Sequence, residues 1–439
     1  MLRKIENDAN SKLLAAQKAK EKSEEKKRQK MMETGVEPQP AKKKKKVYEN
    51  PVRARRIRIF PDVNQKEKIK QWMGAVRFCY NLLVSNYKNV GQGGVNVAVF
   101  RKDVKDAEEG HSWLKAIPCE IKDVAVRDID KARVAHFAKL KKRRIKDSSA
   151  CHNASFKFRS KKDHQESFEV RSRDMIRKTG AFAFVNLSKL NAAEELPEKV
   201  SSSVRFLRDR LGRYFLIVPR EVEKKSENQA PQTLESIVAL DPGVRTFQTT
   251  YDAAGLTSEW GKGDMTQIFL LCRRADKLQG EAAKKKGSKR RGARMQRLRL
   301  LESIKDKVKE IHRKLAVWLC ENYKVILIPL FESSKMARRG ARKLNKNTTR
   351  NMLTWSHYSF RELLKNKAEL YPWVNVIECT EEYTSKTCGR CGEINSKLGG
   401  AKTFKCKPCG FVADRDINGA RNILLKYLSQ FCGSVPESL

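Results

Sequence analysis

Two pairs of cysteines near the C-terminus have the spacing of a metal site. Each pair has the form Cys-x-x-Cys, and the four residues are Cys388, Cys391, Cys406 and Cys409. Four thiolates at this spacing can surround one tetrahedral Zn²⁺ at about 2.3 Å. Because four sulfur ligands leave no position for water, this zinc is expected to be structural. A redox-active pair is the alternative, and the presence of both pairs at ribbon spacing argues against it.

Two aspartates could supply a second kind of chemistry. Asp241 ends an apolar run that starts at Ile237, where a buried carboxylate is costly unless it is paired or holds a cation. Asp416 follows the cysteine region and opens an amphipathic helix over 416–428. Taken alone, Asp-Pro-Gly at 241–243 is only a turn, so the neighbouring motifs decide its interpretation.

Three motifs occur in a specific order along the chain. They are Leu240-Asp-Pro-Gly243, Tyr383-Thr-Ser-Lys-Thr-Cys-Gly-Arg-Cys-Gly392 and Asp414-Arg-Asp-Ile-Asn-Gly-Ala420. This order resembles the RuvC nuclease domain of TnpB proteins, of their eukaryotic relatives the Fanzors, and of type V CRISPR effectors. The resemblance is close over 236–426, whereas the N-terminal half is similar only in plan to the wedge barrel and recognition domain of that family.

The resemblance implies a ribonuclease H-like fold and a metal-dependent nuclease site. In such enzymes three acidic residues bind two Mg²⁺ ions roughly 3.5 to 4 Å apart, which activate a water and stabilise the leaving 3′ oxygen. Asp241 matches the first acid and Asp416 matches the third. The chain is therefore expected to be a Mg²⁺-dependent DNA endonuclease of the Fanzor kind.

The second acid departs from the bacterial pattern. TnpB proteins carry a glutamate at the end of the strand that is equivalent to 325–328 of this chain. Here Pro329 occupies that place, and proline cannot bind a metal. Glu332, Glu381 and Glu382 remain as candidates. Fanzors carry the glutamate on the following strand, which favours Glu381. Because side chains alternate along a strand, Glu381 and Glu382 are expected to point to opposite faces, so that only one reaches the metals.

The charge of the chain indicates a polyanionic partner. The 94 Lys and Arg residues exceed the 51 Asp and Glu residues, which gives a formal net charge of +43. Such an excess is typical of nucleic-acid binding, although a ribosomal or histone-like structural protein would share it. The basic clusters lie at 42–46, 139–146, 284–299 and 338–346. The last two are the candidates for phosphate contacts, and a solvated helix face is the alternative for any single residue.

The hydrophobic pattern predicts an α/β multidomain protein. The strand and helix pattern before residue 226 indicates a small β-barrel with a helical insertion. The resemblance implies that these are a wedge and a recognition domain, followed by a RuvC domain with an inserted zinc ribbon. Strands are expected at 53–60, 167–170, 182–186, 204–207, 214–218 and 325–328, and a long helix at 295–323. The expected ranges are a tail at 1–50, the first wedge strand at 51–62, the recognition domain at 63–165, the wedge at 166–225, a linker at 226–235, the nuclease domain at 236–385, the ribbon at 386–412 and the last nuclease segment at 413–439.

The N-terminal tail contains a candidate localisation signal. Pro40 to Val47 contains five consecutive lysines and resembles a nuclear localisation signal, which implies a nuclear import receptor as a partner and the nucleus as the location. The alternative is a lysine run that simply adds nucleic-acid affinity. Seven further cysteines are scattered, which favours a reducing compartment. No run approaches the roughly 18 apolar residues of a membrane span.

The resemblance implies a monomeric ribonucleoprotein. A noncoding guide RNA would select complementary double-stranded DNA by base pairing, while the protein reads a short adjacent motif. Two other classes of protein remain open: a transposase that uses the same metal chemistry without a guide, and a noncatalytic zinc-ribbon regulator. A nuclease-dead descendant is a further alternative because of Pro329, and the retention of Asp241 and Asp416 argues against it.

Overall fold

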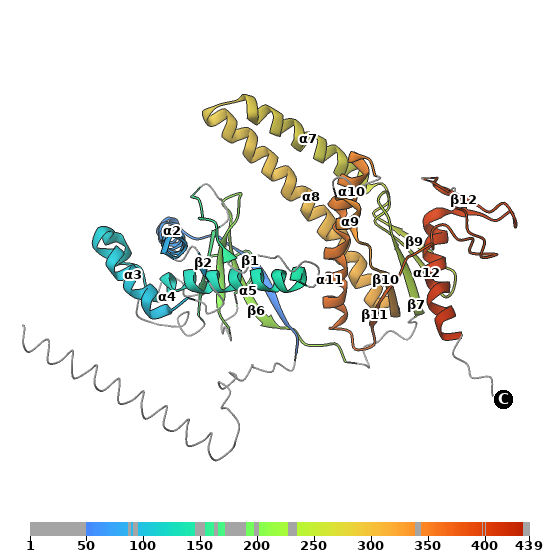
Figure 1. Ribbon diagram of the computed structural model, residues 1–439, viewed down its shortest axis with the longest axis horizontal. Helices are drawn as coiled ribbons and strands as arrows, with labels where there is room; N and C mark the ends of the chain where they lie inside the picture. The colour runs from blue at the N-terminus through green and yellow to red at the C-terminus, as the bar shows by residue number, and fades with distance from the viewer. Residues whose placement is uncertain are drawn as a thin grey trace, which may run out of the picture. The chain divides into compact units, whose positions relative to one another are not determined.

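The computed structural model describes most of the chain after residue 49 (Figure 1). The described residues are 50–86, 89–90, 95–144, 154–161, 166–171, 190–196, 202–226, 235–338, 344–396, 398–399 and 401–432. The lysine run at 42–46, the expected strand at 182–186 and most of the expected linker at 226–235 lie outside these ranges, so they remain predictions. Part of the basic cluster at 338–346 is also outside them.

A four-stranded antiparallel sheet organises the N-terminal half, in the order β1-β6-β5-β4. Its strands are β1 Val52–Ile59, β4 Glu166–Val170, β5 Val204–Arg208 and β6 Tyr214–Glu221. Along β1 the side chains of Ile57 and Ile59 are buried while that of Arg56 is exposed, as the alternating pattern predicts. Two short strands, β2 Asn89–Val90 and β3 Ala154–Ser155, form a separate pair.

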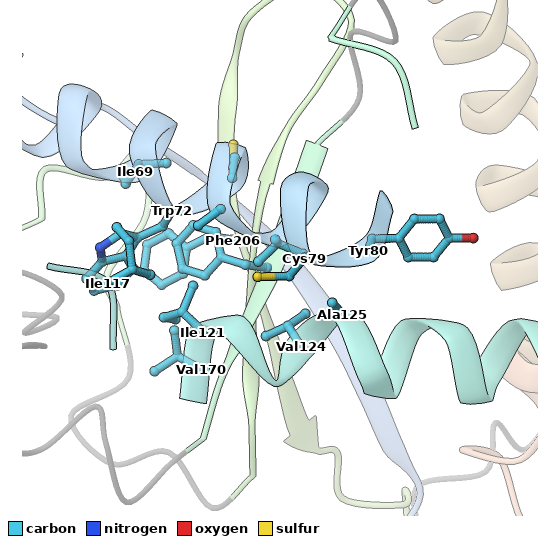
Figure 2. Packing of buried hydrophobic residues seen from close by; sticks show 14 of the residues in the cluster. Ile69, Trp72, Cys79, Tyr80, Ile117, Ile121, Val124, Ala125, Val170 and Phe206 are labelled. Atoms are coloured by element: carbon cyan, nitrogen blue, oxygen red, sulfur yellow. The ribbon is translucent and has the colours of Figure 1, made fainter. Parts of the chain in front are cut away.

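Helices cover one face of this sheet and build the first hydrophobic core. They are α2 Val63–Asn86, α3 Val97–Gly110, α4 Cys119–Lys122 and α5 Val124–Arg144, with a 3-10 turn at Ser112–Leu114. Trp72, Val76 and Tyr80 recur at helical spacing on α2 and are all buried, which confirms that they are core residues. Figure 2 shows Trp72 and Phe206 among the side chains of this core. The Trp72 ring also packs edge-on against Phe168, with the ring centroids 5.5 Å apart.

The expected wedge barrel stays a prediction, because the expected strand at 182–186 lies outside the described ranges. The described strands form one sheet with β4 at one end and β1 at the other. Beyond β1, an isolated antiparallel bridge joins Ile59 to Ala192, and the Phe60 N–H donates to the Asn191 carbonyl at 2.6 Å. The apolar face of the sheet is covered by α2, α4 and α5.

A mixed five-stranded sheet, in the order β11-β10-β7-β8-β9, organises the C-terminal half. Its strands are β7 Glu235–Pro242, β8 Gln248–Asp252, β9 Thr257–Trp260, β10 Tyr323–Pro329 and β11 Asn375–Cys379. Strands β7, β8 and β9 pair antiparallel, whereas β10 is parallel to both β7 and β11. The carboxyl ends of β7, β10 and β11 therefore meet at one edge, which is where open sheets with parallel strands bind ligands.

The two faces of β7 pack against different helices. Val238 and Leu240 belong to a core with side chains of α8 and α11, whereas Ile237 and Ala239 pack against α12. The helices of this half are α7 Asp264–Lys284, α8 Gly287–Asn322, α9 Ser333–Met336, α10 Lys346–Trp355, α11 His357–Ala368 and α12 Arg415–Cys432. Because successive side chains on a strand alternate, the residue after Leu240 is directed to the α12 face.

Helix α8 begins earlier than its apolar stripe predicts. The stripe indicates a start near Met295, but the helix starts at Gly287 and lies beside α7 in a long hairpin (Figure 1). The extra turns at 287–294 contain three Arg and one Lys, which have high helix propensity without needing a buried face, beside Gly287 and Gly292, which do not favour a helix. The helix also ends one residue sooner than expected, since Tyr323 already belongs to β10.

A small antiparallel hairpin links the cysteine region to the last helix. It consists of β12 Thr403–Lys405 and β13 Val412–Asp414, and α12 follows at once. The Asp414 carboxylate accepts a hydrogen bond of 2.9 Å from the Asp416 backbone N–H, as a helix cap does. Among the helices of the described ranges, none combines the length and apolar content needed to cross a membrane.

Candidate functional site

The two cysteine pairs form two knuckles with the same backbone geometry. The Cys388 N–H donates to the carbonyl of Glu393 at 2.8 Å, and the Cys406 N–H donates in the same way to Phe411 at 2.8 Å. In both knuckles the glycine after the second cysteine has a positive φ, +79° at Gly392 and +68° at Gly410. Glycine is favoured at both positions because other side chains rarely adopt this conformation.

The knuckles bring the four sulfur atoms together at distances that suit zinc. Sγ of Cys388 lies 3.6 Å from that of Cys409, Sγ of Cys391 lies 3.5 Å from that of Cys406, and all four atoms are within 4.8 Å of one another. A tetrahedron of about 2.3 Å Zn–S bonds has S–S edges of about 3.8 Å. Burial raises the pKa of Cys388, but backbone N–H groups of Cys391 and Arg390 outweigh it and lower this pKa to about 7. The residues therefore fit a structural Zn²⁺.

Replacement of a zinc ligand should release the metal and loosen the ribbon. The small core beneath the knuckles contains Leu398 and Phe404 together with the cysteines, so it has little apolar surface of its own. We expect the purified wild-type chain to hold one zinc and Cys406→Ser to lose most of it, with faster proteolysis within 386–412. Elemental analysis and limited proteolysis measure both effects. Cys272→Ser, at a buried cysteine outside this cluster, is the control, and full zinc in Cys406→Ser would contradict the assignment.

Asp241 is placed on the α12 face by the alternation of β7. A Cβ added at Gly419 of α12 would lie only 2.6 Å from Asp241 Oδ2, so this glycine leaves the space that the carboxylate occupies. Asp416 lies one turn earlier on the same helix, in its first turn. A Cβ added at Gly243, two residues after Asp241, would lie 3.8 Å from Asp416 Oδ2. The two aspartates that the sequence predicts are therefore brought to one edge of the sheet.

The local electrostatics of these aspartates are unfavourable without a cation. Burial raises the pKa of Asp241 well above its usual range, and the charges of Asp416 and then Glu381 raise it further. Burial also raises the pKa of Asp416, followed by the charge of Asp414, with partial opposition from Arg415. Asp241 keeps some solvent exposure although protein atoms surround it densely. A site of this kind either takes up protons or binds a positive ion.

The three carboxylates fit a divalent cation by their chemistry. They supply hard oxygen donors, and their mutual repulsion is not compensated by a bound lysine or arginine in the hydrogen bonds of the described residues. In the described part of the chain, the four cysteine sulfurs lie within 4.8 Å of one another, whereas the oxygens of these three carboxylates do not all do so. Asp241, Asp416 and Glu381 are the residues that would hold the ions.

The candidates for the second acid differ in their surroundings. Glu381 is half-buried, burial raises its pKa, and its charge acts on Asp241. Glu382 and Glu332 are exposed, and Glu332 forms an ion pair with Lys335. The expected reason for the difference, alternation along a strand, is wrong: β11 ends at Cys379, and Glu381 and Glu382 belong to the turn that follows. In this turn the Glu381 side chain is half-buried and the Glu382 side chain is exposed.

The register of the sheet explains how a glutamate after β11 can approach Asp241. Pro329 at the end of β10 pairs with Cys379 at the end of β11. Ile377 and Cys379 pack on the α12 face of the sheet, the face of Asp241. The charge of Glu381 contributes to the raised pKa of Cys379, about 11, after burial. Glu381 thus follows the strand next to Pro329, the position at which TnpB proteins carry their metal-binding glutamate.

The loop after Asp241 is supported from the opposite face of the sheet. The Trp355 indole N–H donates to the Val244 carbonyl at 3.0 Å, and the Trp355 carbonyl lies 2.9 Å from His312 Nε2. His312 stacks on Phe247 with ring centroids 4.7 Å apart, and burial lowers its pKa to about 4. This histidine is a packing residue, as expected from its position on a helix without metal-ligand partners.

Two asparagines of α12 are part of the site although the sequence analysis assigned them no role. Asn418 and Asn422 are both buried, and their side chains bind the segment between Glu381 and the first knuckle. A signal was present: two amide side chains four residues apart interrupt the buried face of an amphipathic helix.

The predicted basic surface lies partly on the α7–α8 hairpin. Lys289, Arg290, Arg291 and Arg294 are exposed at the start of α8. Among the described residues, none of these four cations forms an ion pair with a carboxylate, so they are available for phosphates. In the cluster at 338–346 the described residues include exposed Arg338 and Lys346, while 339–343 lie outside the described ranges.

Two family models match segments of the chain. Residues 357–423 match the model described as "Cas12f1-like, TNB domain", and residues 52–92 match one described as "Helix-turn-helix domain". The described part of 52–92 contains strand β1 and the single helix α2, so the second description does not correspond to two helices here.

Several proteins are similar over most of their length. Protein A625R of Paramecium bursaria Chlorella virus 1, named a candidate transposase, is 30% identical over 87% of this chain and 88% of its own. TnpB-like protein L79 of Acanthamoeba polyphaga mimivirus is 25% identical over 85% of this chain and 73% of its own. InsQ of Escherichia coli K12, named a candidate RNA-guided DNA endonuclease, is 24% identical over 88% and 95%. Cas12f1 in complex with sgRNA and target DNA covers 85% of this chain and 98% of its own, with 14% identity and a TM-score of 0.33, too low to carry a structural argument.

Proposed function

Since this chain belongs to the TnpB-like family, the IS605 transposase-associated proteins related to Cas12f, we propose that it is an RNA-guided DNA endonuclease. It would bind a noncoding guide RNA as a monomeric ribonucleoprotein and cut complementary double-stranded DNA beside a short adjacent motif. The observation that carries the proposal is the buried carboxylate group at the edge of the mixed sheet, with Asp241 on β7 and Asp416 on α12. The mixed sheet is compatible with the ribonuclease H-like fold that the resemblance implies.

The residues of the site have separate tasks in phosphodiester hydrolysis. Asp241, Asp416 and Glu381 would hold two Mg²⁺ ions, which when bound activate a water and stabilise the leaving oxygen. The backbone of Asp241 is fixed in the middle strand of the sheet, and its carboxylate occupies the space that Gly419 leaves on α12. Asp416 is held by the cap at the start of α12. The exposed cations of α8 would contact phosphates of the nucleic acid.

Copurifying RNA provides the direct test of guidance. The chain would be coexpressed with the genomic DNA that flanks its gene, purified, and its bound RNA sequenced. A discrete noncoding RNA with a variable end is the expected result, and the ribonucleoprotein should cut only DNA that matches this end. Recovery of random cellular RNA, or cutting that does not depend on a match, would refute guidance while leaving the nuclease assignment standing.

A transposase is the second candidate, because the similar viral protein A625R carries that name. The same carboxylates could cut and then join DNA ends without a guide. Strand-transfer products formed on DNA in the absence of RNA would favour this function. A noncatalytic regulator would bind nucleic acid and leave DNA intact at every Mg²⁺ concentration.

Within the family we propose the Fanzor branch and a nuclear location. Two features support it: Pro329 in place of the bacterial glutamate with Glu381 near Asp241, and the lysine run at 42–46. A cationic strip of this kind suits an acidic import receptor. We expect the tagged chain to accumulate in the nucleus of eukaryotic cells and alanines at 42–46 to disperse it. Equal nuclear signal in both would disprove the role of the lysines, and alanines at the lysines of 284–289 provide the control.

A further inference from the structure

Hydrogen bonds from two buried asparagines of α12 hold the segment that joins the turn of Glu381 to the first zinc knuckle. Asn418 Nδ2 donates to the Thr387 carbonyl at 2.8 Å, and its Oδ1 accepts from the Gly389 N–H at 3.0 Å. Asn422 Nδ2 donates to the carbonyls of Thr384 at 2.8 Å and Thr387 at 2.7 Å. Two amides of α12 thus make four hydrogen bonds to three backbone groups of the segment from Thr384 to Gly389.

This segment has a functional residue at each end. Glu381 precedes it, and the Glu381 carbonyl accepts from the Thr384 hydroxyl at 2.9 Å and from the Thr384 N–H at 3.3 Å. Cys388, within the segment, is the first zinc ligand of the cluster. The position of the segment therefore determines both the start of the zinc ribbon and the turn that carries Glu381.

The same asparagines are interleaved with the carboxylate site on α12. Asp416 precedes Asn418 by two residues, and Gly419, which contacts Asp241, follows Asn418 directly. Asn418 is 1% exposed and Asn422 is 6% exposed, so loss of Asn422 would deprive the Thr384 carbonyl of this donor and loss of Asn418 would deprive the Gly389 N–H of this acceptor. A helix that holds Asp416 against Asp241 is thereby tied to the turn of Glu381.

Close packing makes this connection rigid. A Cβ added at Gly389 would lie 2.9 Å from Asn418 Oδ1 and 3.1 Å from Asn422 Oδ1, so the knuckle approaches α12 as closely as a glycine permits. Both asparagines are nearly inaccessible to water, which could otherwise replace their bonds. Groups of this kind orient metal ligands from outside the ligand set.

We propose that Asn418 and Asn422 are positioning residues that couple the zinc ribbon to the divalent-cation site. They hold the Thr384–Gly389 backbone on α12, and zinc fixes the far end of that segment at Cys388. Glu381 is thereby presented to the site that Asp241 and Asp416 form. The ribbon is in this way a structural part of the nuclease site, in addition to any contact it makes with nucleic acid. The inference rests on the proposed function, since it concerns the site proposed for Mg²⁺.

Mn²⁺ binding tests the coupling without any need for cleavage. The full chain, freed of nucleic acid by high salt, would be titrated with Mn²⁺ alone and followed by electron paramagnetic resonance. Binding that disappears in Asp241→Asn defines the carboxylate site. We expect Asn422→Ala and Asn418→Ala to weaken this binding roughly tenfold or more while each keeps its zinc. Ser429→Ala, an exposed residue of α12 that bonds only within its own helix, should match wild type.

A second variant protects the test against loss of folding. Gly389→Ala keeps both amides and adds one methyl group between the knuckle and α12, so it should also weaken Mn²⁺ binding with zinc retained. In cleavage assays these variants should need a higher Mg²⁺ concentration for half-maximal rate and recover much of the rate at saturation, which general instability would not produce. Wild-type Mn²⁺ affinity in folded, zinc-loaded Asn422→Ala and Gly389→Ala would overturn the coupling alone. Absence of Asp241-dependent Mn²⁺ binding in wild type would overturn the proposed metal site and the coupling with it.

Discussion

Asp241→Asn and Asp416→Asn should each reduce DNA cleavage by at least about 10³-fold while binding of RNA and DNA stays close to wild type. Both changes keep the shape of the side chain and remove one negative charge from the group that would hold two Mg²⁺ ions. The contacts of Asp241 with Gly419 are compatible with an amide of the same size. Single-turnover cleavage of matched DNA by the purified ribonucleoprotein measures the loss, and gel-shift titration measures binding.

The same substitution has an effect on stability that is independent of cleavage. Burial and the charges of Asp416 and Glu381 raise the pKa of Asp241 in the folded chain above its unfolded value. The folded state therefore loses stability as pH rises from the unfolded pKa to the raised one, and at neutral pH without divalent ions the ionised carboxylate is destabilising. Asp241→Asn removes this charge, so its melting temperature should be a few degrees above that of wild type under those conditions.

Asp252→Asn is the matched control for both measurements. Asp252 is also buried in the mixed sheet, but it accepts hydrogen bonds from the Tyr323 hydroxyl at 3.1 Å and the Leu256 N–H at 2.8 Å. A carboxylate with such partners should lose stability on substitution and keep cleavage. Normal cleavage by both Asp241→Asn and Asp416→Asn would disprove the site, and a melting temperature of Asp241→Asn below wild type would disprove the electrostatic argument.

The sequence predicts the parts of this fold that depend on local pattern. The two knuckles, the core residues of α2 and the strand before Asp241 all follow from spacing or periodicity that each segment carries by itself. The early start of α8 does not, because its first turns carry no apolar stripe and have α7 alongside them. The wedge barrel stays a prediction, since the expected strand at 182–186 lies outside the described residues.

The site was predictable where a single residue type determines the chemistry. Asp241 and Asp416 stand out as carboxylates next to apolar residues, and the structure brings them together on the α12 face. The role of Asn418 and Asn422 was not predictable, because an asparagine acquires its role only from the backbone groups it meets, and those belong to a segment 29 to 38 residues earlier in the chain. The roles of Gly389 and Gly419 were not predictable for the same reason, because each glycine matters through the space it leaves for another element.

Glu381→Gln should reduce cleavage by at least about 10²-fold, whereas Glu382→Gln and Glu332→Gln should stay within about twofold of wild type. Glu381 is the candidate whose charge acts on Asp241, and it follows Cys379, which packs on the Asp241 face of the sheet. Glu382 is the next residue in the same turn, but its side chain is exposed, so Glu382→Gln is a matched control for Glu381→Gln.

The discriminating measurement is single-turnover cleavage by the three variants, prepared with the same RNA and compared over a range of Mg²⁺ concentrations. Loss in Glu332→Gln with normal cleavage in Glu381→Gln would move the second acid to the segment after β10 and leave the displacement unexplained. Loss in Glu382→Gln alone would mean that the turn reverses when ions bind. We expect cleavage to be lost in Glu381→Gln alone and to be restored in part by high Mg²⁺. Pro329 occupies the place beside Asp241 that a ligand would otherwise fill, so the ligand is expected to come from the turn after the neighbouring strand β11.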